Sequence, residues 1–122
     1  MAETKQANVQ KRDTTFKQEH GAVAHMVKRK PQQAVARALQ GAQKLVAEGQ
    51  GKQALNVLTL VKPVLTEQRP EEMADYFEAL GDIHASMGAE KPAARAYVQA
   101  AAVPGLDGAR ATLLAQKAEP HS

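Results

Sequence analysis

Apolar side chains recur along much of the chain at the spacing of an amphipathic helix. Over residues 32–48 they fall four, three and four positions apart, so they share one face of a helix. These residues are Val35, Leu39, Ala42 and Val46. Four later segments show similar spacing between glycines and prolines: residues 52–65, 70–87, 92–103 and 106–118. Because strand-like alternation is lacking and only 3% of residues are aromatic, the pattern predicts an all-α fold.

Glycine and proline mark where the predicted helices begin and end. Gly49, in the segment "EGQGK", suits the left-handed conformation that often follows a helix. Pro70 and Pro92 are expected at helix starts, where the missing backbone donor costs nothing. Pro63 is expected to kink or end the helix over residues 52–65.

The first thirty residues differ from the rest in charge and pattern. They carry a net charge of +4, whereas residues 31–122 carry −1. The first dozen are polar and aperiodic, which indicates disorder. Residues 14–29 have a weak helical pattern interrupted by Gly21, so they form either a docking helix or a marginal one. We therefore expect a basic, largely disordered or marginally helical arm over 1–30 and a helical domain over 31–122.

The four central helices divide into two pairs that can be aligned on Gly49 and Gly88, 39 residues apart. The second pair carries small, aromatic and turn residues in a fixed order: Phe77, Leu80, Gly81, Gly88, Ala93, Tyr97, Ala100 and Pro104. In this order and spacing, residues 74–105 resemble the tetratricopeptide repeat family, and residues 35–66 resemble it more loosely. Two departures are His84, where a tyrosine is usual, and Pro104, which comes one residue early.

The resemblance implies antiparallel αα-hairpins stacked as a short superhelix, with residues 106–118 as a C-terminal capping helix. Gly81 and Ala93 are expected to face each other, because small residues allow helices to approach to about 8 Å. A generic helical bundle is the alternative, since any tight hairpin favours glycine and alanine at such positions.

Acidic residues form a stripe along the predicted third helix, at spacings of four, three and four residues. Its members are Glu71, Asp75, Glu78 and Asp82. A solvated helix face is the simplest interpretation. The resemblance implies a second one, in which the first helix of each pair lines a concave groove through Ala36, Leu39, Gln43, Asp75, Glu78 and Asp82. Such a groove would be apolar at one end and acidic at the other, which suits a partly basic helix or extended peptide.

The chain offers little for catalysis. There is no cysteine, and the four histidines have neither paired-ligand spacing nor a nucleophile beside them. His84 is expected to be a half-buried substitute for an aromatic ring. We therefore expect no enzyme activity, no cofactor and no metal. No stretch approaches the roughly 18 apolar residues of a membrane span, so we expect no membrane association and a cytoplasmic location.

The function expected from these features is that of a protein–protein interaction adaptor. Alternatives are a secretion-type chaperone for one dedicated partner, or a nucleic-acid-associated protein that uses residues 5–30. The run "VKRKP" at 27–31 has few aromatic neighbours, which disfavours the nucleic-acid alternative. Two repeats are few for an isolated array, so either the caps complete the core or the protein forms a homo-oligomer through Val57, Leu60 and Val64. Two alternatives stay open for the arm. Either Lys28, Arg29 and Lys30 lie on or near the acidic groove and compete with the partner, or the arm does not dock.

Overall fold

The computed structural model describes residues 2–121, with side chains described from Thr14 to His121. All regular secondary structure in this range is helical, which confirms the all-α prediction. The elements are α1 (Ala2–Arg29), α2 (Pro31–Ala47), α3 (Gly51–Thr59), η1 (Lys62–Val64), α4 (Pro70–Ser86), α5 (Glu90–Ala101), α6 (Gly108–Ala118) and η2 (Glu119–His121).

The helix boundaries follow the glycines and prolines closely, with two differences. Pro70 begins α4 as expected, whereas α5 begins at Glu90, two residues before Pro92. Proline is tolerated there because the first turn of a helix has no internal partner for its backbone donors. Helix α3 ends at Thr59, and Pro63 lies in the short 3₁₀ helix η1. Pro63 thus separates two helical segments and does not kink a continuous one.

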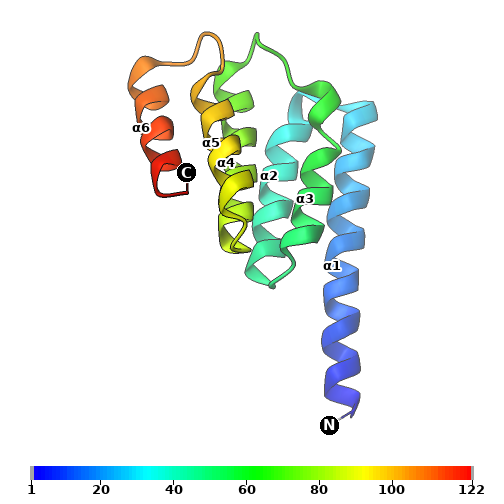
Figure 1. Ribbon diagram of the computed structural model, residues 1–122. Helices are drawn as coiled ribbons and strands as arrows, with labels where there is room; N and C mark the ends of the chain where they lie inside the picture. The colour runs from blue at the N-terminus through cyan, green and yellow to red at the C-terminus, as the bar shows by residue number, and fades with distance from the viewer. Residues whose placement is uncertain (1, 122) are drawn as a thin grey trace. The chain divides into compact units, whose positions relative to one another are not determined.

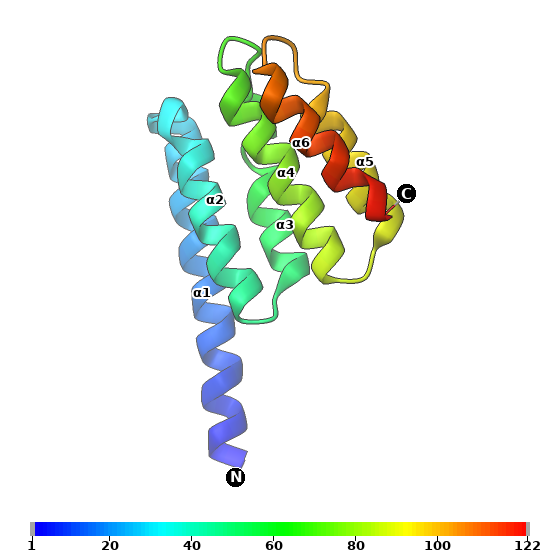
Figure 2. The ribbon, with the colours of Figure 1, turned by 90° about the vertical axis from the view of Figure 1, so that its left-hand side faces the viewer.

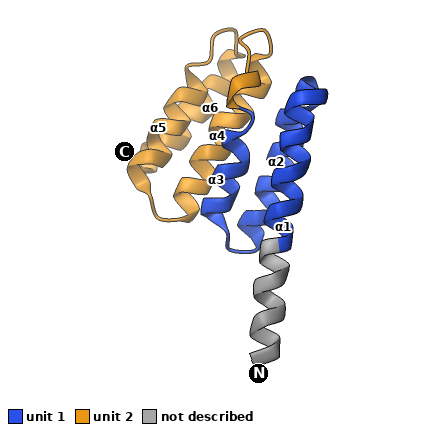
Figure 3. Cartoon of the chain, turned by 90° about the vertical axis from the view of Figure 1, so that its right-hand side faces the viewer, with its two compact units in different colours: residues 1–61 blue, residues 62–122 orange. Residues whose placement is uncertain are grey.

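The chain forms two compact units, residues 1–61 and 62–122 (Figure 3). These bounds differ from the expected arm over 1–30 and domain over 31–122, because α1 belongs to the first unit. The first dozen residues were expected to be disordered. Their side chains lie outside the described ones, so this expectation stays a prediction. From Thr14 to Arg29 the chain is helical, and Val23 is fully buried.

In the first unit, α2 and α3 form an antiparallel hairpin, and α1 packs against both helices (Figure 1). Gly49, with φ of 76°, makes the turn as predicted. Helix α3 buries Ala54, Val57 and Leu58. The expectation that Val57 is exposed for self-association is therefore wrong, since α3 has neighbouring helices on two sides.

In the second unit, α4 and α5 form the corresponding hairpin, turned at Gly88 with φ of 75°. Helix α6 packs against α5 after a reversal at Gly105, where φ is 81° (Figure 2). Its first turn is capped by the side chain of Asp107, which accepts a hydrogen bond of 3.2 Å from the backbone amide of Arg110. Helix α6 buries Leu114 and Ala118.

The tight approach of α4 and α5 occurs at Gly81. A Cβ atom at this position would lie 2.6 Å from Cε1 of Tyr97. The atoms nearest to an added side chain at position 81 are thus those of Tyr97 on α5, and the expected pairing of Gly81 with Ala93 stays a prediction. Ala93 is fully buried in a cluster with Tyr97 and Ala118. Glycine is needed at position 81 because an aromatic ring fills the space where a side chain would be.

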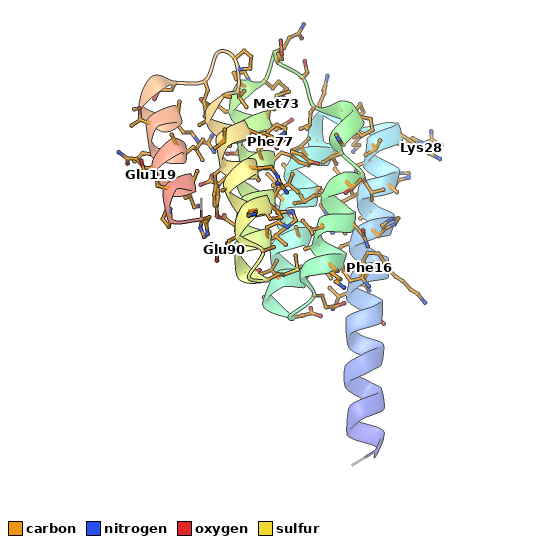
Figure 4. The ribbon with its side chains drawn as sticks, in the orientation of Figure 1. Phe16, Lys28, Met73, Phe77, Glu90 and Glu119 are labelled. Carbon is orange, nitrogen blue, oxygen red and sulfur yellow. The ribbon has the colours of Figure 1, made fainter. Side chains whose placement is uncertain are left out.

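Most of the other side chains that carried the family resemblance are buried or half-buried. Ala100 is fully buried, and Phe77 packs as a half-buried side chain against the same cluster as Ala100. Figure 4 labels Phe77 and Met73 on α4, and both pack against this cluster. Leu80 is half-buried, whereas Pro104 is exposed.

Candidate functional site

The groove residues expected on α2 lie on a partly exposed part of the first unit. Ala36 and Gln43 are exposed, and Leu39 is half-buried. In the second unit, Asp75 and Glu78 are half-buried and Asp82 is exposed on α4. That these residues line one groove stays a prediction.

The acidic stripe on α4 is in contact with basic side chains of the same chain. We keep the name acidic stripe for Glu71, Asp75, Glu78 and Asp82. Arg110 of α6 donates from Nη1 to Oε2 of Glu71 over 2.7 Å. Its Nη2 donates to Oδ1 of Asp75 over 2.5 Å and to Oε1 of Glu78 over 3.3 Å. One guanidinium therefore bridges three carboxylates.

Lys117, two helical turns further along α6, contacts the remaining part of the stripe. Its Nζ lies 2.9 Å from Oε2 of Glu78 and 2.9 Å from Oδ1 of Asp82. The same ammonium lies 5.1 Å from the ring centroid of Tyr97. Tyr97 donates its hydroxyl hydrogen to Oδ1 of Asp82 over 2.5 Å. Lys117, Tyr97 and Asp82 thus hold α6, α5 and α4 together at one point.

These contacts favour the charged forms of both cations. Partial burial disfavours the ammonium of Lys117, but hydrogen bonds to Asp82 and Glu78 outweigh it, so the pKa of Lys117 is raised. The pKa of Arg110 is raised in the same way, against a desolvation penalty, by Glu71 and Asp75. For Tyr97, burial and the bond to Asp82 raise the pKa. The tyrosine therefore stays neutral and remains a donor.

The acidic stripe keeps excess negative charge and solvent access despite these contacts. Four carboxylates face two cations. The side chains of Glu71, Asp75 and Asp82 are 59%, 47% and 52% exposed. Ion pairs this accessible contribute about 0–1 kcal/mol each and weaken with salt. The surface can therefore exchange one basic side chain for another at little cost.

Matching periodicity explains why α6 fits the stripe. The acids recur every three or four residues along α4, and Arg110 and Lys117 are seven residues apart on α6. Leu114, between these two cations, is buried on the same side of the helix. Sequence reasoning missed both cations. Their separation of seven residues matches the repeat of the acids on α4, and this match could have indicated the contact.

A second charged cluster missed by sequence reasoning lies in the first unit, between α1 and α2. Glu19 is 3% exposed and accepts hydrogen bonds of 2.8 and 2.7 Å from Nη1 and Nη2 of Arg37. Lys44 lies 3.9 Å from the same carboxylate. The hydrogen bonds from Arg37 lower the pKa of Glu19, although burial acts in the opposite direction. Gly41 leaves room for Glu19, since an added Cβ would lie 3.1 Å from Oε1.

The Glu19 cluster is structural in character. Its donors and acceptors satisfy one another, and no buried polar side-chain atom lacks a partner in the described part of the chain. It joins α1 to α2, because Glu19 of α1 accepts both hydrogen bonds from Arg37 of α2. Residues 14–29 are thus held by this pair together with the fully buried side chain of Val23.

The histidines occupy unrelated surroundings. His84 is half-buried, as expected, on α4. His20 lies against the ring of Phe16, labelled on α1 in Figure 4. His121 lies 2.5 Å from Glu90 through Nδ1 and tilts against the ring of Tyr97. Among the described residues, no group of three or more potential ligands is placed to hold a metal ion.

Two findings concern the class of the protein. Within residues 2–121, no helix has the length and apolar character that crossing a membrane requires. No known family model, curated protein or solved structure matches this chain. The tetratricopeptide resemblance therefore stays a prediction that rests on the residues named above.

Proposed function

We propose that the protein is a non-catalytic adaptor of the tetratricopeptide type that binds a partly basic helix or peptide of another protein. The observation that carries this proposal is the engagement of the acidic stripe by Arg110 and Lys117. A helix with two cations seven residues apart already fits this surface. The partner is expected to present the same arrangement of charge.

The surplus charge of the stripe supports a basic partner more than a neutral or acidic one. Its four carboxylates outnumber the two cations that contact them, and three of the four are about half exposed. A basic side chain approaching this surface is attracted, whereas a carboxylate is repelled. The expected groove positions on α2, which are Ala36, Leu39 and Gln43, belong to the first unit and stay a prediction of the resemblance.

The arm has a different role under this proposal from the one expected. The basic side chains that contact the stripe are those of Arg110 and Lys117 on α6. Lys28 is exposed at the end of α1, where Figure 4 labels it. Residues 14–29 of α1 then serve to complete the first unit. The proposal includes a location in the cytoplasm, with which a chain without cysteine is compatible.

The test is a titration of a basic amphipathic helical peptide into the full-length protein at low ionic strength. The comparison is made in Arg110→Gln/Lys117→Gln, because the cations of α6 contact the same carboxylates in the wild type. In this background, Asp75→Asn/Glu78→Gln is expected to raise the dissociation constant of the peptide roughly tenfold, because two carboxylates of the surface lose their charge. Glu67→Gln/Glu72→Gln removes the same charge outside the stripe and should leave binding nearly unchanged. Equal losses in both variants would mean that only net charge matters. Absence of binding to the wild-type protein would contradict the proposed function.

A further inference from the structure

We propose that α6 is an internal occupant of the surface that α4 and α5 present to a partner helix, and that a basic partner helix replaces it there. This inference rests on the proposed function and concerns how the same surface is regulated. It makes α6 an autoinhibitory element, which must leave its place before a partner can bind.

The polar contacts of α6 with α4 depend on only two side chains. Arg110 contacts three carboxylates and Lys117 contacts two, and these cations are themselves 25% and 40% exposed. Water and ions therefore reach the contacts. Such contacts weaken as the ionic strength rises, because mobile ions screen accessible charges. The polar part of the α6 contact is thus adjustable by salt and by competing cations.

The apolar part of the contact involves few side chains of α6. Leu114 packs with Ala74, Ala100 and Val103, and Ala118 packs with Ala93 and Tyr97, whereas α5 itself buries five side chains. A replacing helix must therefore cover the same apolar side chains. Leu113 on α6 is 66% exposed, so the opposite face of the helix has no apolar cover. An isolated helix of 11 residues is marginal in water, so α6 depends on this contact for its own order. Elements with few buried contacts open at a lower free energy than the rest of a protein.

The connection to α5 allows α6 to leave and return. Residues 102–107 join the two helices, and Gly105 makes the reversal in the left-handed conformation. A tethered helix has an effective concentration in the millimolar range, which keeps the surface occupied by α6 in the absence of a partner. A partner must therefore bind better than α6 or be present at high concentration.

The chemistry of the replacing helix can be stated from the contacts of α6. Arg110, Leu114 and Lys117 are at positions i, i+4 and i+7, and they lie on one side of the helix. A partner helix with two basic side chains seven residues apart and a leucine between them would make the same contacts. A third basic side chain would gain from the surplus of carboxylates on the acidic stripe.

The experiment uses a fluorescent synthetic peptide with the sequence of residues 106–121 as the probe. It is titrated into the full-length wild-type protein and into full-length Arg110→Gln/Lys117→Gln. Because the tethered helix of the variant competes less well, the wild-type peptide should bind the variant roughly tenfold more tightly than it binds the wild-type protein. Lys91→Gln/Arg95→Gln removes two exposed cations of α5 and should bind the peptide like the wild type.

Two outcomes of this titration would overturn the proposal. One is equal affinity of the peptide for the wild type and for Arg110→Gln/Lys117→Gln. The other is unchanged binding of a peptide that itself carries both glutamines, since the contact would then not depend on Arg110 and Lys117. If the peptide shows no exchange but the basic-peptide titration still depends on Asp75 and Glu78, autoinhibition fails and the proposed function stands. If exchange is seen but no basic partner helix binds, the proposed function fails.

Hydrogen exchange of the wild-type protein gives a second readout that needs no variant. Amides of α6 are expected to exchange faster at high ionic strength, whereas amides of α4 and α5 keep their protection. This result would support independent undocking of α6. Exchange of α6 only together with α4 and α5, in one global opening, would overturn the proposal.

Discussion

Replacing Gly81 by alanine tests how closely α4 and α5 approach each other. The added Cβ would lie 2.6, 2.7 and 2.9 Å from three ring atoms of Tyr97. The shortest of these distances is about 0.8 Å below the 3.4 Å at which ordinary contact begins. Either the ring or the helix backbone must therefore move.

The ring of Tyr97 has little freedom to move. It is 2% exposed, its hydroxyl is bonded to Asp82, and the rings of Tyr97 and His121 lie 5.6 Å apart. Overpacking of a core costs about 1–3 kcal/mol, and a clamped ring favours the upper end of that range. Alanine returns about 1 kcal/mol through its higher helix propensity. The net loss expected for Gly81→Ala is about 2 kcal/mol, or about 8 °C in the melting temperature.

The assay is chemical denaturation followed by circular dichroism at 222 nm. Gly21→Ala is the matched control, because a Cβ at this exposed position in α1 meets nothing within 4 Å. It is expected to stabilise the protein by up to about 1 kcal/mol. In a Tyr97→Leu background, Gly81→Ala should cost much less, because the ring is absent. If Gly81→Ala stabilises the protein as Gly21→Ala does, the described packing of Tyr97 is refuted.

The remaining predictions concern the Glu19 cluster and one turn. Glu19→Gln should destabilise the protein by about 1–3 kcal/mol in the same assay, because Arg37 loses its buried partner, and a loss below 0.5 kcal/mol would contradict the buried pair. Since folding lowers the pKa of Glu19, its stabilising contribution is present above the ordinary value of 4.5 and is lost as the pH falls through the folded-state value. Denaturation at several acidic pH values should therefore show a steeper loss in the wild type than in Glu19→Gln, and parallel curves would contradict this assignment. Gly88→Ala should cost about 1–2 kcal/mol, because φ is 75° there, whereas Gly108→Ala should be nearly neutral.

Local signals in the sequence were sufficient to predict the turns and the presence of the helices that follow α1. Gly49 and Gly88 were predicted as turns because a positive φ favours glycine, and both have φ near 75°. The start of α4 at Pro70 follows equally from the geometry of proline. Such features depend on a few neighbouring residues, so the pattern alone reveals them.

Contacts between distant residues explain what the sequence did not reveal. The carboxylates of the acidic stripe were identified, but their partner Arg110 lies 39 residues after Glu71. Glu19 and Arg37 are 18 residues apart, and their pairing turns a weakly patterned segment into a docked helix. Ion pairs of this kind are specified by how helices pack. The pattern of one helix gives the spacing of its charges but not the helix that receives them.

Under the two proposals, the acidic stripe of α4 is a binding surface for a basic helix, and α6 occupies it. The most direct measurement is amide chemical-shift mapping by NMR of the full-length protein during titration with a basic amphipathic peptide. The largest changes are expected on α4 between Asp75 and Asp82, together with changes along α6 as it is released. Changes confined to α1 and α2, with α4 and α6 unaffected, would contradict it.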